Sequence, residues 1–525
     1  MKATKNRTIA IMSAAAAMLG LALIGLASCS SGDSSTGQVT TGGSAALQGP
    51  MVFVNNTGDK TLTSVALKGD SGNVVLGTIA SAEFEGVALG DMQFSEGEWI
   101  FLNLGAANKV ATIDPLTGAV PVHETNLATG TRPVHIYRDP TDGEVIWSMN
   151  DGDNTGGTGD DLINCAVQTG SSVTILHNSH LGPGGNPPTV EKTVCVLADG
   201  HHVTAFSSGA GVPKRAFVSS DTGGEIAVID NEPGPAQWTM TYRIDLCNPA
   251  KEADPLTCNP ENPTGATAFT PNNAHPHGIR WSKFTQKVYS IQEGYGEIAE
   301  VDPTTLAITN TFDLTGLPYT AFGISPDGRF LLLRGDTTPA TGTNLGVIDI
   351  GTAGTPRKDF VIPEMNGTSP GSFKFSPDGN RFYILAGNAA TATKRNLLFA
   401  FDSSKLIPVA PATEPALTLL LNGEISLLQT GGHSMDVLAQ GPTGAGEAKY
   451  IVVSNTGTPG SVSIINAADN SIKQHVTVGP APGGVMVYYP GAATAGNQAT
   501  SSLTGGPKAK PSVLPERLDD HGMPE

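Results

Sequence analysis

The stretch Ala274-His275-Pro276-His277-Gly278-Ile279-Arg280-Trp281-Ser282 begins a unit that predicts the fold of the whole chain. Residues 287–290, 296–303 and 306–312 follow it, with turn residues between these runs. Four short strands separated by turns are typical of one blade of a β-propeller. The same unit recurs in degenerate form along most of the chain, so we expect an all-β propeller.

The second strand of each unit is the clearest repeated element, because it is a short run rich in β-branched, aromatic and aliphatic residues. Its eight copies begin at Met51, Trp99, Val145, Ala216, Val288, Phe330, Phe382 and Tyr450. Two units carry Ser-Pro-Asp-Gly before this strand, at residues 325–328 and 376–379. Pro presets φ and Gly accepts positive φ, so each tetrapeptide predicts a tight turn between the first and second strands.

A family resemblance is carried by residues 301–306, 316–318 and 322–328, and again by residues 461–466 and 478–485. These segments resemble the repeat of YVTN-type, lactonase-like β-propellers. The resemblance covers roughly residues 50–490 and implies inner strands that surround a central channel.

The two ends of the repeat region predict how the ring closes. Residues 484–489 form a first strand with no unit behind it, and residues 51–79 form a unit with no first strand before it. Pairing them would remove the free edge of the sheet. We therefore expect eight blades, with seven as the alternative if one weak early unit is not a blade.

The composition fits this architecture and limits the partners. The 525 residues include 64 Gly and 37 Pro, and the formal net charge is −18. An acidic protein repels nucleic acid and anionic membrane surfaces, so we expect no nucleic-acid partner. The charge suits cations or a basic envelope protein, or it only maintains solubility. We expect a monomer.

Residues 1–28 resemble a bacterial lipoprotein signal peptide. An apolar run at residues 9–24 follows three cations, Lys2, Lys5 and Arg7. The small residues before Cys29 imply cleavage there and lipid on its sulfur; an ordinary secretory signal with an incidental Cys is the alternative. The run is short for a membrane span. Acyl chains would anchor the protein in the cell envelope, and Ser30 favours the outer membrane of a Gram-negative cell.

We expect four segments: the signal peptide (1–28), a flexible Ser/Gly/Thr-rich tether (29–49), the propeller (50–490) and a disordered tail (491–525). Within the propeller, residues 151–200 and 233–273 depart from the minimal repeat. We expect these two stretches to be insertions that cap one face of the ring.

Four cysteines follow Cys29, and an even number in an exported protein suggests disulfides. Cys247 and Cys258 flank a loop that contains Pro and Asp, and we expect them to close it. Cys165 and Cys195 flank the longer insertion and are expected to pair by elimination. A Cys-rich metal site is disfavoured because the chain has no Cys-x-x-Cys.

The histidines provide the candidate site. Five of the eleven lie where first strands are expected to begin: His135, His201, His202, His277 and His433. Because first strands line the axis, imidazoles from four blades would approach one mouth of the channel. Convergent neutral imidazoles suit transition metals better than Ca²⁺ or Mg²⁺. We predict a Cu or Zn site with the ligands His135, His202, His277 and His433.

Two alternatives weaken this metal prediction. Side chains alternate along a strand, and His135 and His202 stand one position later in the repeat than the others, so not all five can point the same way. They could instead be separate polar residues bound to water.

A calcium site is a second candidate, on the Asp/Gly-rich residues Asp151, Asp153, Asn154, Asp160 and Asp161, although their spacing is not that of an EF-hand.

The sequence thus predicts a ligand-binding propeller lipoprotein and leaves open whether it is an enzyme. A redox or hydrolytic enzyme that uses the channel is one alternative, and a scaffold for an envelope protein is another. Every Cys after Cys29 has a disulfide partner to hand, and no Cys-x-x-Cys-His is present to attach haem. No catalytic residue is predicted; Glu293, near His277, is only a guess for a hydrolytic carboxylate.

Overall fold

The computed structural model describes residues 49–488 of the chain except 96–98, 116–118, 128–129, 153–169, 179–186, 199–201, 254–257, 259–270, 318, 336–344, 361, 363–367, 389–396, 407–418, 428–431 and 441–445. Contacts divide the chain into two units, Met1–Gln38 and Val39–Glu525, and every described residue belongs to the second.

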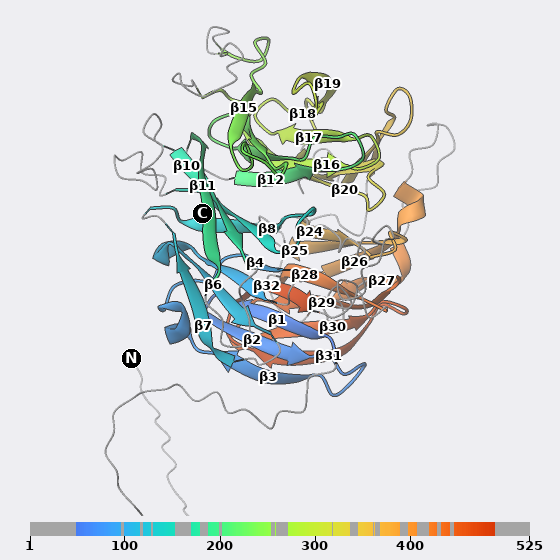
Figure 1. The fold of residues 1–525 in the computed structure, drawn as a ribbon. Helices are drawn as coiled ribbons and strands as arrows, with labels where there is room; N and C mark the ends of the chain where they lie inside the picture. The colour runs from blue at the N-terminus through green and yellow to red at the C-terminus, as the bar shows by residue number, and fades with distance from the viewer. Residues whose placement is uncertain are drawn as a thin grey trace, which may run out of the picture. The chain divides into compact units, whose positions relative to one another are not determined.

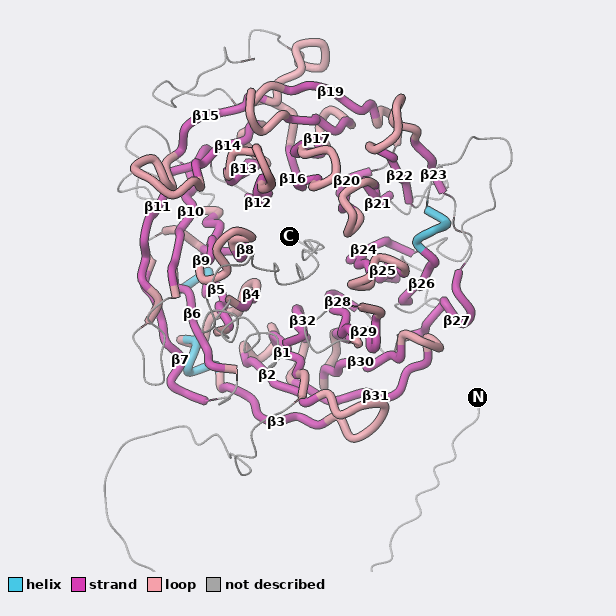
Figure 2. Tube along the Cα trace, turned by 45° about the vertical axis from the view of Figure 1, so that its right-hand side comes forward, coloured by secondary structure: helices cyan, strands magenta, loops and turns pink. Residues whose placement is uncertain are grey.

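The described residues form eight four-stranded antiparallel sheets, each of which is one blade of a propeller (Figures 1 and 2). The strands of a blade are named in order from the channel outward. Blade 1 contains β32 (Pro482–Tyr488), β1 (Met51–Asn56), β2 (Thr61–Ala66) and β3 (Val74–Ile79). Blade 2 contains β4 (Met92–Phe94), β5 (Ile100–Leu104), β6 (Lys109–Asp114) and β7 (Ala119–Asn126). Blade 3 contains β8 (Pro133–Arg138), β9 (Val145–Asn150), β10 (Gly170–His177) and β11 (Thr189–Ala198). Blade 4 contains β12 (His202–Ser207), β13 (Arg215–Ser220), β14 (Glu225–Asp230) and β15 (Met240–Asp245).

The second half of the ring repeats the same order. Blade 5 contains β16 (Pro276–Ser282), β17 (Lys287–Gln292), β18 (Glu297–Val301) and β19 (Ile308–Asp313). Blade 6 contains β20 (Tyr319–Ile324), β21 (Phe330–Gly335), β22 (Leu345–Asp349) and β23 (Arg357–Phe360). Blade 7 contains β24 (Thr368–Phe375), β25 (Arg381–Asn388), β26 (Leu397–Asp402) and β27 (Leu419–Ser426). Blade 8 contains β28 (Gly432–Ala439), β29 (Ala448–Asn455), β30 (Gly460–Asn466) and β31 (Ser471–Val478).

Short 3-10 turns include η1 (Ser81–Phe84), η2 (Gly105–Ala107) and η5 (Ser403–Leu406). No helix among the described residues is both long and apolar enough to cross a membrane.

Blade 1 closes the ring with strands from both ends of the propeller. Strand β32 pairs antiparallel with β1, so that Met51 lies opposite Tyr488 and Asn55 opposite Gly484. The pairing extends into the adjoining turn, where the backbone N–H of Thr57 donates to the carbonyl of Ala481 at 3.0 Å. The prediction of eight blades closed by terminal strands is confirmed, and the seven-blade alternative is wrong.

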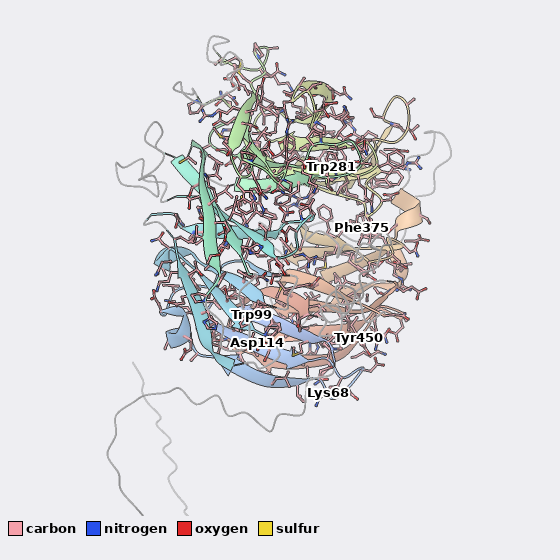
Figure 3. All side chains as sticks on the ribbon, viewed as in Figure 1. Lys68, Trp99, Asp114, Trp281, Phe375 and Tyr450 are labelled. Atoms are coloured by element: carbon pink, nitrogen blue, oxygen red, sulfur yellow. A yellow bond between two sulfur atoms is a disulfide. The ribbon has the colours of Figure 1, made fainter. Side chains whose placement is uncertain are left out.

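Packing between neighbouring blades explains why second strands are continuous apolar runs. Each blade is covered on both faces, and all six residues of β1 and of β9 are buried. The described core forms eight hydrophobic clusters, one at each interface between neighbouring blades. Trp281 and Phe375 belong to two of them (Figure 3). Burial of large side chains on both faces of every sheet is the main stabilising contribution.

The two Ser-Pro-Asp-Gly segments form the predicted turns between first and second strands. In the first, the N–H of Gly328 donates to the carbonyl of Ser325 at 2.8 Å, and Gly328 has a φ of 82°. A Cβ at this glycine would lie 3.0 Å from the backbone N of Lys283 and of Phe284. Gly is therefore required here both for the turn and for the close approach of blade 5.

The two expected insertions contain strands that the sequence interpretation missed. Residues 151–200 include β10 and β11, and residues 233–273 include β15. Outer strands have more exposed positions and mix polar with apolar residues, as in Thr189-Val190-Glu191-Lys192-Thr193, so their periodicity is weak. What remains beyond the minimal repeat lies mostly outside the described residues.

Candidate functional site at the channel mouth

Inner strands begin at one end of the ring, which we call the mouth, and finish at the other end, which we call the rear face. The four histidines predicted as metal ligands occupy the first three residues of their strands: His135 in β8, His202 in β12, His277 in β16 and His433 in β28. Three of these strands belong to consecutive blades, 3, 4 and 5, and blade 8 is four blades away from blade 4. The side chains of His202 and His433, and all of His201, lie outside the described residues.

His135 is held by a carboxylate from the preceding blade. Its side chain is 3% exposed, and Nδ1 lies 2.8 Å from Oδ2 of Asp91, just before β4. The Asn103 side chain donates to the carbonyl of His135 at 3.0 Å and accepts from the Ser148 hydroxyl at 3.0 Å. The N–H of Asn103 also donates to the Asp91 carbonyl at 3.1 Å. Asn103 thus fixes both members of the His–Asp pair.

His277 lies beside a carboxylate of its own blade, without the hydrogen-bond geometry of the His135–Asp91 pair. Its side chain is 24% exposed, and Nδ1 lies 3.2 Å from Oε1 of Glu293 in the turn between β17 and β18. The interaction with Glu293 raises the pKa of His277; burial opposes this, the charge of Asp221 adds to it and that of Arg334 reduces it. Glu293, only a guess from the sequence, is therefore the direct partner of a predicted ligand.

A glycine in the β17–β18 turn allows Glu293 to reach this position. The N–H of Glu293 donates to the carbonyl of His275 at 3.1 Å, and the N–H of Gly294 donates to the carbonyl of Ala274 at 3.0 Å. A Cβ at Gly294 would lie 1.9 Å from the carbonyl oxygen of Asn273. Only glycine lets this turn lie directly against the start of β16.

Asp221 brings a second histidine into the same group. Nδ1 of His275 lies 3.5 Å from Oδ1 of Asp221, which is in the turn between β13 and β14 of blade 4. His275 has a φ of 47°, which bulky residues rarely adopt. We call Asp221, His275, His277 and Glu293 the mouth cluster.

The predicted Cys247–Cys258 disulfide is present, with Cα atoms 5.4 Å apart, and its loop is attached to the mouth end of blade 5. Within the loop, Lys251 Nζ donates to the carbonyl of Tyr295 at 2.8 Å and to Glu297 Oε2 at 2.7 Å. Glu252 accepts from the Tyr295 hydroxyl and from the N–H of Asn273. Tyr295 is two residues from Glu293, so the loop braces the turn that positions the mouth cluster.

The other sequence predictions have mixed outcomes. Cys195 is disulfide-bonded, but Cys165 lies outside the described residues. Asp151 is buried, and the remaining members of the calcium candidate, Asp153, Asn154, Asp160 and Asp161, are also outside that part of the chain. Calcium binding therefore stays a prediction, as does the four-histidine site.

One further motif has the form Gly-x-Ser-x-Gly, at residues 367–371. In esterases this pattern makes a sharp turn from a strand into a helix, which exposes the serine. Here Thr368 is the first residue of β24, and the chain continues as a strand to Phe375. The motif lacks the strand–turn–helix context of a nucleophile elbow.

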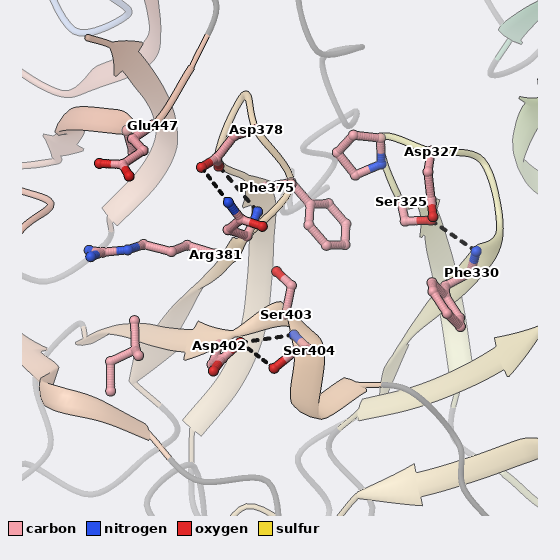
Figure 4. A pocket seen from close by; sticks show the side chains of 15 residues that line it. Ser325, Asp327, Phe330, Phe375, Asp378, Arg381, Asp402, Ser403, Ser404 and Glu447 are labelled. Atoms are coloured by element: carbon pink, nitrogen blue, oxygen red, sulfur yellow. Dashed lines mark hydrogen bonds between the residues drawn. The ribbon is translucent and has the colours of Figure 1, made fainter.

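A cavity of about 650 Å³ lies on the rear face between blades 6, 7 and 8 (Figure 4). Three aspartates line it, but each accepts hydrogen bonds within its own turn. Asp327 accepts from the N–H of Arg329, Asp378 from the N–H of Asn380, and Asp402 from the N–H and hydroxyl of Ser404. These acids are explained by turn formation.

A buried carboxylate, Glu225, lies at the mouth end of blade 4 and has no hydrogen-bond partner among the described residues. Its side chain is 1% exposed, and Oε2 is 4.0 Å from Nη1 of the buried Arg243. Burial raises the pKa of Glu225 well above its ordinary value; the charge of Arg243 opposes this and that of Asp245 adds to it. Burial in the folded protein thus favours the protonated form more than in an exposed carboxyl group.

Glu225 should make the protein less stable as the pH rises. The pKa of Glu225 is higher in the folded than in the unfolded state, so between these two pKa values the folded state binds more protons. The contribution of Glu225 to the free energy of unfolding is therefore complete below the unfolded-state pKa. Above that pKa it falls by at most about 1.4 kcal/mol per pH unit. Glu225→Gln should flatten this slope, as measured by denaturant unfolding from mildly acidic to neutral pH. Two results would contradict the raised pKa of Glu225. One is an equal pH slope of the unfolding free energy in the wild type and the variant. The other is a large loss of stability at neutral pH, as expected if the substitution broke an ion pair with Arg243.

Comparison with known proteins shows the fold. No protein-family model and no curated protein matches the chain. Among solved structures, dihydro-heme d1 dehydrogenase NirN in complex with DHE is 12% identical, with 86% of this chain and 77% of that chain covered and a TM-score of 0.53. The periplasmic gluconolactonase of Pseudomonas aeruginosa is 15% identical, with 84% and 99% covered and a TM-score of 0.47. Apo AztD from Citrobacter koseri is 13% identical, with 84% and 97% covered and a TM-score of 0.48. At 12% identity, the likeness to the NirN structure shows a shared fold and nothing finer.

Proposed function

We propose that the protein is a ligand-binding β-propeller lipoprotein of the cell envelope that binds a transition-metal ion, Cu or Zn, at the mouth. The observation that carries this proposal is that both described histidines of the predicted set have Nδ1 against a carboxylate: His135 against Asp91 and His277 against Glu293. Metal-ligating histidines usually donate their other ring N–H to such a group, which fixes the tautomer and ring orientation.

The arrangement suits a cation for two further reasons. With Nδ1 on the carboxylate, Nε2 is the ring nitrogen that would bind the ion, and His202 lies on the blade between His135 and His277. The carboxylates of Asp91, Asp221 and Glu293 also give the mouth negative charge, which raises the local concentration of cations. His433, four blades from His202, would complete the ligand set from across the channel.

The metal proposal predicts a graded loss of binding. His277→Ala or His135→Ala should reduce Zn²⁺ or Cu²⁺ affinity by more than about 100-fold, and Glu293→Gln or Asp91→Asn by about 10- to 100-fold, because the latter remove only the supporting carboxylate. Calorimetric titration and elemental analysis of chelator-treated, reloaded protein measure this.

The control is His475→Ala, since His475 is on the outer strand β31 with Nδ1 3.0 Å from the Ser463 hydroxyl. Its affinity should equal that of the wild type. Unchanged binding in all four mouth variants would refute the metal proposal. Detergent phase partitioning checks the anchor separately, because Cys29→Ser should move the protein to the aqueous phase.

An enzyme that uses the same mouth is the second candidate, and the His277–Glu293 pair favours it. A carboxylate that raises the pKa of a histidine also makes it a better general base. Hydrolysis that persists after complete removal of metal and disappears in His277→Ala would support the enzyme over the metal-binding protein.

A further inference from the structure

A second group of metal-binding side chains lies on the rear face of blade 3, away from the mouth. Asp142 and Glu144 belong to the turn between β8 and β9, and His177 is the last residue of β10. Each offers one ligand atom, and these three atoms all lie within 4.8 Å of one another. Among the described residues this is the one group of three or more His, Cys, Asp or Glu side chains with that geometry. We call it the rear-face triad.

Strand register brings the triad together from residues 33 to 35 positions apart in sequence. His177 pairs with Val145, the residue after Glu144. The pairing continues into the turn, where the N–H of Asn178 donates to the carbonyl of Glu144 at 3.2 Å. His177 and Glu144 are therefore held on adjacent strands by backbone bonds that do not depend on either side chain.

The turn that carries the two acids is fixed independently. Oδ1 of the buried Asp139 accepts from the N–H groups of Thr141, at 2.7 Å, and Asp142, at 3.1 Å. The N–H of Val145 donates to the carbonyl of Asp142 at 3.0 Å. Preorganised ligand positions lower the entropy cost of binding an ion.

The two carboxylates of the triad, Asp142 and Glu144, lack a Lys or Arg partner among the described residues. Nε2 of His177 lies 3.7 Å from Oε2 of Glu144, which is longer than a hydrogen bond. Two carboxylates this close repel each other, and a divalent cation between them would remove the repulsion.

We propose that Asp142, Glu144 and His177 bind a divalent first-row transition-metal ion of the Zn²⁺ type. One imidazole with two carboxylates suits Zn²⁺ better than Ca²⁺ or Mg²⁺, which take oxygen ligands. Three protein ligands leave at least one position for water or an external donor. The ion would join the β8–β9 turn to the end of β10.

The test uses the mature chain in a His135→Ala/His277→Ala background, which removes described mouth ligands. Titration with ZnCl₂ should give one bound ion, and Asp142→Asn/Glu144→Gln should lose affinity by more than about 100-fold. The matched control is Asp378→Asn/Glu447→Gln, two carboxylates at the rear-face cavity, which should bind as the background does. Titration with CoCl₂ is a second readout, because His177→Gln should change the visible absorption of a nitrogen-ligated ion.

Circular dichroism in chelator checks that all variants have the same fold. Equal Zn²⁺ affinity in the triad variant and its control would overturn the proposal, and so would a background that binds no Zn²⁺. Failure of the mouth proposal would give a different result. In that case the mouth variants would bind Zn²⁺ as tightly as the wild type, and only the triad variant would lose a bound ion.

Discussion

A chain that ends at residue 479 should fail to form the closed ring. It lacks β32, so the whole inner edge of β1 loses its partner, and Val485, Met486, Val487 and Tyr488 leave the hydrophobic clusters on both sides of blade 1. Burial of four such side chains contributes about 6–12 kcal/mol, at about 1.5–3 kcal/mol each. This is comparable with the whole stability of a typical domain, about 5–15 kcal/mol.

The loss also extends to blades 7 and 8. Asp436 of β28 accepts from the N–H of Val487 at 2.7 Å and from Lys374 Nζ of β24 at 2.5 Å. Lys374 is buried, so truncation would disturb an ion pair in which desolvated groups depend on each other. The exposed edge of β1 would be a template for aggregation.

Size-exclusion chromatography, thermal melting and limited proteolysis measure the effect. The control is a chain that ends at residue 490, which keeps β32 and removes only the tail that the sequence predicts to be disordered. It should melt like the full chain. A monomeric 479-residue chain with an unchanged melting temperature would show that pairing of the terminal strands does not hold the ring.

Asp139→Ala is the point substitution from which we expect the largest loss of stability, about 3–5 kcal/mol. Oδ2 of this buried carboxylate accepts from Trp147 Nε1 at 3.1 Å and from Asn231 Nδ2 at 2.6 Å. Asn231 in turn accepts from Trp238 Nε1 at 3.1 Å, so the network joins blades 3 and 4. Alanine would leave two buried donors and the N–H groups of the β8–β9 turn without an acceptor.

Denaturant unfolding measures this cost, and a double-mutant cycle identifies its origin. Trp147→Phe removes the indole N–H and keeps most of the buried ring, so Asp139→Ala should cost less in that background than in the wild type. Equal costs in both backgrounds would mean that the Trp147 hydrogen bond contributes nothing. A total loss below about 1 kcal/mol would contradict the network itself.

The fold was predictable because its repeat is local. Each second strand is recognisable as a short apolar run, since both faces of the blade are buried, and the two Ser-Pro-Asp-Gly turns mark the spacing. Closure followed from counting strands at the two ends. The outer strands β11 and β15 were missed because partial exposure removes the continuous apolar pattern. Strand β10 is buried, but the polar residues Ser172 and Thr174 interrupt its apolar run.

The candidate site was predictable only in part, because partners come from other blades or other turns. The strand starts of His135 and His277 could be read from the repeat, but Asp91 belongs to the preceding blade and its contact depends on Asn103. The rear-face triad depends on the register of β9 and β10, which no local pattern in the sequence specifies.

The pairing of Met51 with Tyr488 also decides how the ring responds to tension between these two residues. Met51 and Tyr488 lie opposite each other at the same end of two antiparallel strands, β1 and β32. A force that pulls them apart therefore breaks the backbone hydrogen bonds one pair at a time, as in unzipping. A shear geometry would load all the bonds between the strands together and resist a much larger force. The joint that completes the propeller would therefore open from the Met51–Tyr488 end when these two residues are pulled apart.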